Sequence, residues 1–379
     1  MPLLPRTVLT CGLFFIASLS VSAEESGFRR PLIHNGQLDG WIVTGCEVTV
    51  ADGVLTLKSG DGFVRSDHRY RDFILELEWR TTKADAWDSG IYIRSDLPRD
   101  GQKWPDRYQI NLLKGNEGNL IGVEGARSQG LSVDGQWNKM KVTVTGRRVK
   151  MEMNDKPAWE AEGLDNERGY IGFQAEVTQG GIFEFRNIYL TELGYKPLFN
   201  GQDLTGWEGA DRDASLCWSV EDSLLMCNGK PGPWLRSAAK YDDFNLRLEY
   251  KTRPGGNSGV YCRVPADGNH HGAGAGVEVQ ILDDAAEQYK NLKPYQYCGS
   301  VYAIAPALQR VGKPAGEWNS LEINCKGTAY VVTHNGVVIV HACEEAFPEI
   351  KQRLREGFLG LQNHSEEVWF RNIRIGPAD

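Results

Sequence analysis

Two copies of one sequence pattern fill most of this 379-residue chain, so each half must fold into the same kind of unit. Six blocks recur in the same order. The clearest pairs are PLIHNGQLDGW (31–41) with PLFNGQDLTGW (197–207), DSGIYIR (88–94) with NSGVYCR (257–263), and FEFRNIYL (183–190) with VWFRNIRI (368–375). The spacing between matched blocks widens toward the C-terminus, which indicates longer loops in the second copy.

Both copies consist of short segments in which apolar and polar residues alternate. FILELEW (73–79) and FNLRLEY (244–250) show this period, which is typical of strands with one buried face. Asn335-Gly336 lies between two such segments and predicts a two-residue hairpin turn. Helical periodicity is confined to 348–357, where we predict one short helix ended by Gly357. The sequence therefore predicts an all-β fold of two tandem jelly-roll sandwiches.

The N-terminus has the anatomy of a signal peptide. Arg6 precedes an uncharged apolar run, and the small residues up to Ala23 predict cleavage after that position. The expected parts are thus a signal peptide (1–23), a first domain (24–193) and a second domain (194–379), in an exported, periplasmic or extracellular protein. The junction is too short for a flexible linker, so we expect the copies to pack together. No later segment approaches the ~20 apolar residues of a membrane span.

Composition and cysteines exclude some classes of function. The net charge is -8 without a basic block, so no nucleic-acid partner is expected. The sequence does not fix the oligomeric state. Cys11 would leave with the signal peptide, and no Cys/His spacing typical of zinc occurs. Cys217 and Cys227 flank a turn at Asp222 and would lie opposite each other, either as a disulfide or as two buried thiols.

Three segments of the second copy carry polar residues on the strand face opposite the core. Alternation directs these side chains outward: Tyr261, Arg263, Glu278, Gln280, Gln362 and His364. If the three strands share a sheet, the set converges. It is then either a solvated face or the floor of a binding groove. Amides, a carboxylate and an aromatic ring suit a polyhydroxylated ligand, so carbohydrate is the ligand that the residues favour.

The acidic residues do not fit an ordinary glycosidase, which needs two carboxylates across the scissile bond. Glu278 stands without a clear acidic partner in the set. An isolated acid beside a histidine fits proton transfer or metal binding better.

Seven blocks of the second copy, among them GGNSGVYCR, VEVQILDD and GFLGLQNH, together resemble the 3-keto-disaccharide hydrolase family, with its concanavalin A-like lectin/glucanase fold. The first copy resembles the family more weakly. The resemblance implies an exported enzyme that cleaves glycosides already oxidised at C3. A 3-keto group acidifies the hydrogen on C2, so a base can remove it, the group at C1 can leave, and water can add afterwards.

This chemistry needs a base and a group that stabilises an enolate. We expect three catalytic residues, Glu278, His364 and Arg263, and four that position the sugar: Asn257, Tyr261, Gln280 and Gln362. Gln280 is also expected to contact the enolate oxygen together with Arg263. A divalent metal ion is left open, with Glu278 and His364 as its candidate ligands. The role split between these two residues is also open.

The first copy departs from the pattern at the same places. Our sequence pairing puts Asp88 at the position of Asn257, Arg107 at Glu278 and Glu176 at His364, and it retains Arg94 and Gln109. A first copy without the carboxylate is expected to bind sugar or to support the second copy. Two other hypotheses compete for the whole chain: a carbohydrate-binding tandem module without catalysis, and an adhesion or scaffold pair.

Overall fold

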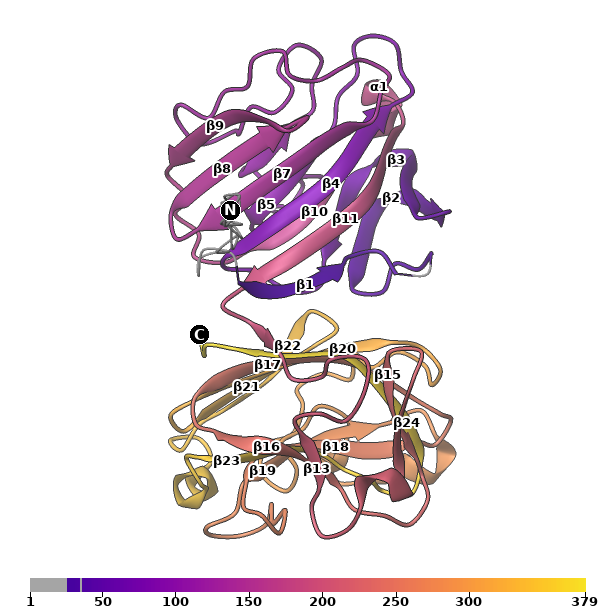
Figure 1. Cartoon of the computed structure of the whole chain (residues 1–379), viewed down its shortest axis with the longest axis vertical. Helices are drawn as coiled ribbons and strands as arrows, with labels where there is room; N and C mark the ends of the chain where they lie inside the picture. The colour runs from indigo at the N-terminus through magenta and orange to yellow at the C-terminus, as the bar shows by residue number, and fades with distance from the viewer. Residues whose placement is uncertain (1–25, 35) are drawn as a thin grey trace, which may run out of the picture.

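The computed structural model describes residues 26–34 and 36–379, so the predicted signal peptide with Cys11 lies outside the described residues. In the described part, the chain is nearly all β and forms two sandwich units, one above the other in Figure 1. A single α-helical turn, α1 (Val177–Gly180), interrupts the strands described here. The predicted all-β fold in two copies is confirmed.

Within the described residues, the first unit is one continuous sheet of eleven strands that folds over on itself. Strand β3 passes between the two layers, since its first residues pair with β11 and its later residues pair with β10. Phe173 of β10 and Phe185 of β11 meet between the layers, with ring centroids 4.4 Å apart. The strands are β1 (Gly27–Pro31), β2 (Trp41–Ala51), β3 (Val54–Ser66), β4 (Phe73–Thr81), β5 (Gly90–Ser95), β6 (Gln109–Asn111), β7 (Asn138–Thr145), β8 (Arg148–Met153), β9 (Lys156–Glu162), β10 (Tyr170–Glu176) and β11 (Phe183–Leu193).

The second unit, all of which is described, has two separate sheets. Eight strands form one sheet, in the order β14-β15-β24-β17-β20-β21-β22 with β12 beside β24, and five form the other, in the order β13-β16-β23-β18-β19. The strands are β12 (Lys196–Pro197), β13 (Trp207–Gly209), β14 (Trp218–Glu221), β15 (Leu224–Asn228), β16 (Leu235–Tyr241), β17 (Phe244–Thr252), β18 (Asn257–Val264), β19 (Val277–Leu282), β20 (Asn319–Lys326), β21 (Ala329–His334), β22 (Val337–Ala342), β23 (Gly357–Leu361) and β24 (Glu367–Gly376).

The core of the second unit lies between these sheets, as the alternation predicts. Val260, Val279 and Leu361 from the five-stranded sheet are buried in one apolar cluster with Leu246 and Ile323 from the other. The predicted hairpin turn is also confirmed. Asn335 and Gly336 join β21 to β22, and both have the positive φ that a type I′ turn requires.

The predicted helix at 348–357 is wrong in length and type. A 3₁₀ helix covers only Pro348–Gln352, and Gly357 begins β23 instead of ending a helix. The backbone leaves the helix because it bonds elsewhere: the Leu354 N–H donates to the Ala275 carbonyl. The Arg353 guanidinium donates to the carbonyls of His270 and Gly276. Tertiary hydrogen bonds therefore replace the helical ones.

The predicted opposition of Cys217 and Cys227 is off by one residue. The hairpin register places Cys227 opposite Trp218, and Cys217 precedes the strand. Both sulfurs are free thiols in the buried core, and the Cys217 thiol lies 3.3 Å from the Pro233 carbonyl oxygen. Of the two outcomes that the sequence left open, the structure has the pair of buried thiols.

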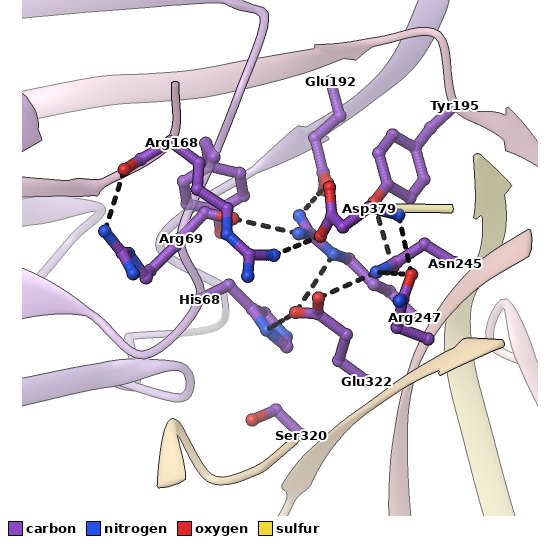
Figure 2. A network of polar contacts seen from close by, with 12 residues as sticks. His68, Arg69, Arg168, Glu192, Tyr195, Asn245, Arg247, Ser320, Glu322 and Asp379 are labelled. Atoms are coloured by element: carbon purple, nitrogen blue, oxygen red, sulfur yellow. Dashed lines mark hydrogen bonds and ion pairs between the residues drawn. The ribbon is translucent and has the colours of Figure 1, made fainter. Parts of the chain in front are cut away.

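The two units pack together through buried ion pairs, as the short junction predicts. Figure 2 shows Arg247 of the second unit between Glu192 of the first unit and Glu322 of the second. The Arg247 guanidinium lies 2.7 Å from the Glu192 carboxylate and 3.3 Å from the Glu322 carboxylate. His68 of the first unit reaches Glu322 at 3.2 Å. Arg374 closes the network on Glu192 at 2.6 Å. The residues that the second unit contributes, Arg247, Glu322 and Arg374, lie on β17, β20 and β24. The first unit therefore covers the eight-stranded sheet, and the five-stranded sheet lies on the far side (Figure 1).

This interface predicts acid sensitivity. Burial alone would raise the pKa of Glu192, but Arg374, Arg247 and Arg30 outweigh it and hold the pKa at about 2; Arg30 and Arg371 likewise hold the pKa of Glu249 at about 2. A carboxyl whose pKa is lower in the folded state stabilises the fold above its unfolded pKa of ~4.3 and loses that contribution as the pH falls toward 2. Chemical unfolding between about pH 6 and pH 3 should show a loss on the order of 3 kcal/mol. An unchanged free energy of unfolding would contradict this.

Candidate functional site

The three strands that carry the predicted polar set are neighbours in the five-stranded sheet. Strand β18 lies between β19 and β23. Gly259 pairs with Gln280 and Tyr261 with Glu278 on one side, and Val260 pairs with Leu361 on the other. The condition for convergence is therefore met, on the sheet that the first unit does not cover.

A cavity of about 240 Å³ opens on this sheet and collects most of the predicted residues. It is small by the standard of ligand sites and suits one sugar ring. Five of the seven predicted residues line it, together with seven that the sequence analysis did not select. The lining residues are Asn257, His270, His271, Glu278, Gln280, Leu282, Tyr289, Leu292, Gln296, Tyr302, Gln362 and His364.

Glu278 lies on the cavity wall with one carboxylate oxygen engaged and the other free. Its side chain is 3% exposed, and Oε2 lies 3.1 Å from Nε2 of His270. Oε1 is buried without a hydrogen-bond partner among the described residues. Gly259 makes room for this arrangement, since a Cβ at that position would lie 2.1 Å from Oε1. The site thus holds a carboxylate with an unused acceptor atom, which costs free energy unless a ligand supplies a donor.

The two histidines of the cavity have opposite electrostatic settings. Burial lowers the pKa of His270, but the hydrogen bond to Glu278 and its negative charge outweigh burial, so the pKa lies above its usual value. Burial and the charge of His270 both lower the pKa of His271. At neutral pH His271 is therefore a neutral imidazole that can both donate and accept.

Amide side chains cover the rest of the polar floor. Gln280 Nε2 donates to Asn257 Oδ1 at 2.8 Å, which fixes both groups at the end of the cavity. Gln362 Nε2 donates to the Tyr261 hydroxyl at 3.1 Å. Gln362 Oε1 is buried and has no partner among the described residues, so it can accept from a ligand hydroxyl.

Tyr261 and Arg263 do not line the cavity. Tyr261 is only 6% exposed and lies behind His270, with the two rings stacked at 4.9 Å. Arg263 was expected on the outer face, but the register shifts between Tyr261 and Val264, and Arg263 takes a positive φ of 55°. This irregularity turns the Arg263 side chain away from the site and into the interior of the unit, so that it is fully buried.

Arg263 instead ties loops together. Its guanidinium donates to the carbonyls of Asp242 and Gly327 and to the Asp243 carboxylate at 2.6, 2.7 and 2.8 Å. Arg94 of the first unit makes the equivalent contacts to Arg71, Gly146 and Asp72. The arginine at this position therefore stabilises the fold in both copies, and the prediction that Arg263 is a catalytic residue is wrong.

His364 lies at the rim of the cavity, with its side chain 53% exposed and Nδ1 3.3 Å from Glu366 Oε2. The candidate metal ligands of the sequence analysis, Glu278 and His364, thus each have another partner. Across residues 26–34 and 36–379, no three His, Cys, Asp or Glu side chains are grouped to hold a metal ion. The residues present therefore do not fit a metal centre.

His270, His271, Tyr289 and Tyr302 were missed because they lie outside the strands, Tyr289 in a 3₁₀ helix (Glu287–Tyr289) and the others on loops, so strand alternation does not apply to them. The one local signal was the histidine pair in the glycine-rich segment DGNHHGAGAG (267–276), between the two strands of the site. Its backbone returns to the sheet through a hydrogen bond from Gly276 N–H to the Asn269 carbonyl.

The first unit has no equivalent carboxylate, although our sequence pairing was shifted. In the first unit Gly90 pairs with Asn111 and Tyr92 pairs with Gln109. In the second unit the corresponding pairs are Gly259 with Gln280 and Tyr261 with Glu278. Gln109, not Arg107, therefore stands at the position of Glu278. Arg107 lies on the surface, 3.6 Å from Asp165. The Gln109 amide donates to Gln174, the counterpart of Gln362, so a neutral amide replaces the carboxylate of the second unit.

A larger cavity, of about 450 Å³, lies at the junction of the two units between Tyr195, Tyr241 and Phe244. It lacks converging acids, histidines and amides. The chemistry of the smaller cavity makes that one the candidate site. Among the described residues, no helix is long and apolar enough to cross a membrane.

Comparison with known proteins matches both units to one family. The model of the 3-keto-alpha-glucoside-1,2-lyase-like domain matches residues 29–191 and again 194–376. A 3-keto-disaccharide hydrolase of Bacteroides thetaiotaomicron is 28% identical in an alignment of 229 residues, and the match covers 49% of this chain and 79% of that protein.

Solved structures give similar matches. Two proteins of Parabacteroides distasonis ATCC 8503, provisionally described as glycosyl hydrolases, are 26% and 29% identical to this chain. They have TM-scores of 0.43 and 0.42, and the matches cover 49% and 48% of this chain and 94% and 98% of theirs.

Proposed function

Since this chain belongs to the family of 3-keto-alpha-glucoside-1,2-lyase-like domains, we propose that its second unit cleaves 3-keto-glycosides or 3-keto-disaccharides. The glycosidic bond breaks by elimination across C1 and C2, and hydration of the product completes net hydrolysis. Export of the protein, expected from residues 1–23, is part of the same proposal.

One observation carries the proposal: the free Oε1 of Glu278 on the wall of a one-sugar cavity. A buried carboxylate oxygen without a donor is suited to take a proton from a bound ligand. Besides Glu278 and its partner His270, the lining consists of amides, phenols, two histidines and two leucines, which suit a polyol better than a charged ligand. Within the lining there is no second carboxylate for oxocarbenium chemistry, so the base acts on an already acidic carbon.

The reaction proceeds in three balanced steps. Glu278 takes the proton from C2, and the electrons of the C–H bond form an enolate with the C3 carbonyl. The enolate then expels the oxygen on C1, leaving a double bond between C1 and C2, and the departing oxygen takes up a proton. Water finally adds across that double bond, its oxygen bonding to C1, and gives the free 3-keto sugar.

The neighbouring groups have distinct tasks in this scheme. Gln280 Nε2 donates to Asn257 Oδ1 and to the Ile281 carbonyl, so the Asn257 amide N–H is the group that can stabilise the enolate oxygen. Gln362 Oε1 accepts from a sugar hydroxyl. His364 lies at the rim with its side chain half exposed, and we assign it to proton delivery to the departing oxygen.

Turnover of defined substrates tests the function. The chain from residue 24 should cleave 3-keto-trehalose or a 3-keto-glucoside and leave the unoxidised sugars intact, with or without EDTA. Equal cleavage of both would mean ordinary glycosidase chemistry. A thermal shift with these sugars but no cleavage would favour the carbohydrate-binding module, and no effect at all would favour the adhesion or scaffold pair.

A pair of glycine substitutions tests which unit is active. Gly259→Ala places a Cβ 2.1 Å from Glu278 Oε1 and should displace the carboxylate, so we expect roughly 100-fold lower kcat/KM. Gly90→Ala creates the same collision in the first unit, 2.0 Å from Gln109 Nε2, and should leave kcat/KM unchanged. Circular dichroism would confirm that both variants are folded. A loss of turnover in Gly90→Ala would contradict the assignment.

A further inference from the structure

Both ring nitrogens of His270 face hydrogen-bond acceptors. Nε2 lies 3.1 Å from Glu278 Oε2 and Nδ1 lies 3.1 Å from the Gly268 carbonyl oxygen. A neutral imidazole has one N–H and could satisfy only one of these two acceptors, whereas the imidazolium satisfies both. The geometry therefore favours a protonated His270 beside an ionised Glu278.

The plane of the His270 ring is fixed by its surroundings. Tyr261 stacks on it, with centroids 4.9 Å apart and planes inclined by 22°. The segment around it is anchored to the protein, because Arg353 donates to the His270 carbonyl at 2.9 Å and to the Gly276 carbonyl at 3.2 Å. Since the ring cannot turn freely, its hydrogen bond sets the orientation of the Glu278 carboxylate.

The first unit supplies an internal comparison. At the position of Glu278 it has Gln109, whose amide bonds to Gln174. The loop of the first unit between β5 and β6, residues 96–108, contains no histidine. Where the carboxylate is absent, the imidazole is absent too, so His270 is not a general requirement of this fold.

We propose that His270 is the positioning residue of the site: its imidazolium holds Glu278 Oε2 and thereby keeps the carboxylate ionised with Oε1 directed at the sugar. The proposal rests on the proposed role of Glu278 and adds a residue that acts through it. The charged or titratable groups around His270 are Glu278 on β19, Tyr261 on β18, Arg353 after the 3₁₀ helix and His271 on its own loop. Of these, only Glu278 brings a negative charge against the ring.

Proton titration of the His270 ring by NMR tests the pairing without any substrate. Replacing the carboxylate in Glu278→Gln should lower the titration midpoint of His270 by about one pH unit or more, because the opposite charge is lost. His270→Gln identifies the signal by its disappearance. An unmoved midpoint in Glu278→Gln would overturn the pairing, whether or not the protein cleaves 3-keto sugars.

Kinetics of two variants test the positioning role. His270→Ala should lower kcat by roughly 10-fold or more with KM changed less than about threefold, and His270→Gln, which can still donate to Oε2, should recover part of kcat. In both variants the acid limb of the pH–rate profile should move to higher pH, because a buried carboxylate without a cation binds its proton more readily. The alkaline limb caused by loss of the His270 proton should vanish.

A matched control removes a histidine elsewhere. His341→Ala, on the exposed side of β22, should leave kcat and both limbs unchanged. A merely structural role of His270 would lower stability without moving the pH limbs, and that result, or full kcat in His270→Ala, would overturn the proposal. If His270→Ala does not fold, the pH profile of His270→Gln decides. An inactive wild-type protein would refute the function, while the NMR titration would still decide the pairing.

Discussion

Glu278→Gln is expected to lower kcat for a 3-keto-glycoside by at least about 100-fold, because an amide cannot accept the C2 proton. The fold should survive, since glutamine has the same shape and can still bond to His270. Glu278 contributes the free carboxylate oxygen of the cavity, so its loss removes the chemical step rather than the binding of the sugar. Single-turnover kinetics would separate the two, and a thermal shift with the sugar should persist.

Gln109→Ala is the matched control, because Gln109 occupies the same register position in the first unit. It should leave turnover unchanged. More than about a tenth of the wild-type kcat in Glu278→Gln would refute the role of Glu278 as base and move that role to His271 or His364.

Glu192→Gln should lower the free energy of unfolding by about 3–5 kcal/mol, since it leaves the buried Arg374 without its ion-pair partner and removes one of the two carboxylates beside Arg247 and beside Arg30. Glu192 is 1% exposed and pairs with Arg247 and Arg374 of the other unit and with Arg30 of its own. Removing one partner of a buried pair costs more than the pair contributes, because the remaining charge stays desolvated. Guanidinium unfolding curves would measure the change.

Glu160→Gln provides the comparison at the surface. It breaks an ion pair with Arg148 at 3.2 Å in which both side chains are more than half exposed, so a loss within about 1 kcal/mol is expected. Similar losses in the two variants would mean that the network between the units contributes no more than a surface pair.

Alternation located most of the candidate site, because a strand has only two faces and the core takes one of them. Glu278, Gln280, Gln362 and His364 reach the cavity as alternation predicts, and Asn257 does so as the family resemblance implies. Alternation failed at Arg263, where one extra residue between Tyr261 and Val264 reverses the facing. Matching the sequence blocks of the two copies misaligned the first copy, since only the pairing of strands shows that Gln109 stands at the position of Glu278.

The sequence by itself determined the duplication, the all-β sandwich and the polar face of the site, since these follow from repeats and from the period of neighbouring side chains. The tertiary structure alone decided three things: that His270 returns to Glu278, that Arg263 faces away, and that the units meet through Arg247, Glu192 and Glu322. The second and third depend on contacts between residues distant in the chain, and the first depends on how the loop of residues 265–276 folds back onto β19. Loop closure and desolvation set those contacts, and no local pattern encodes them.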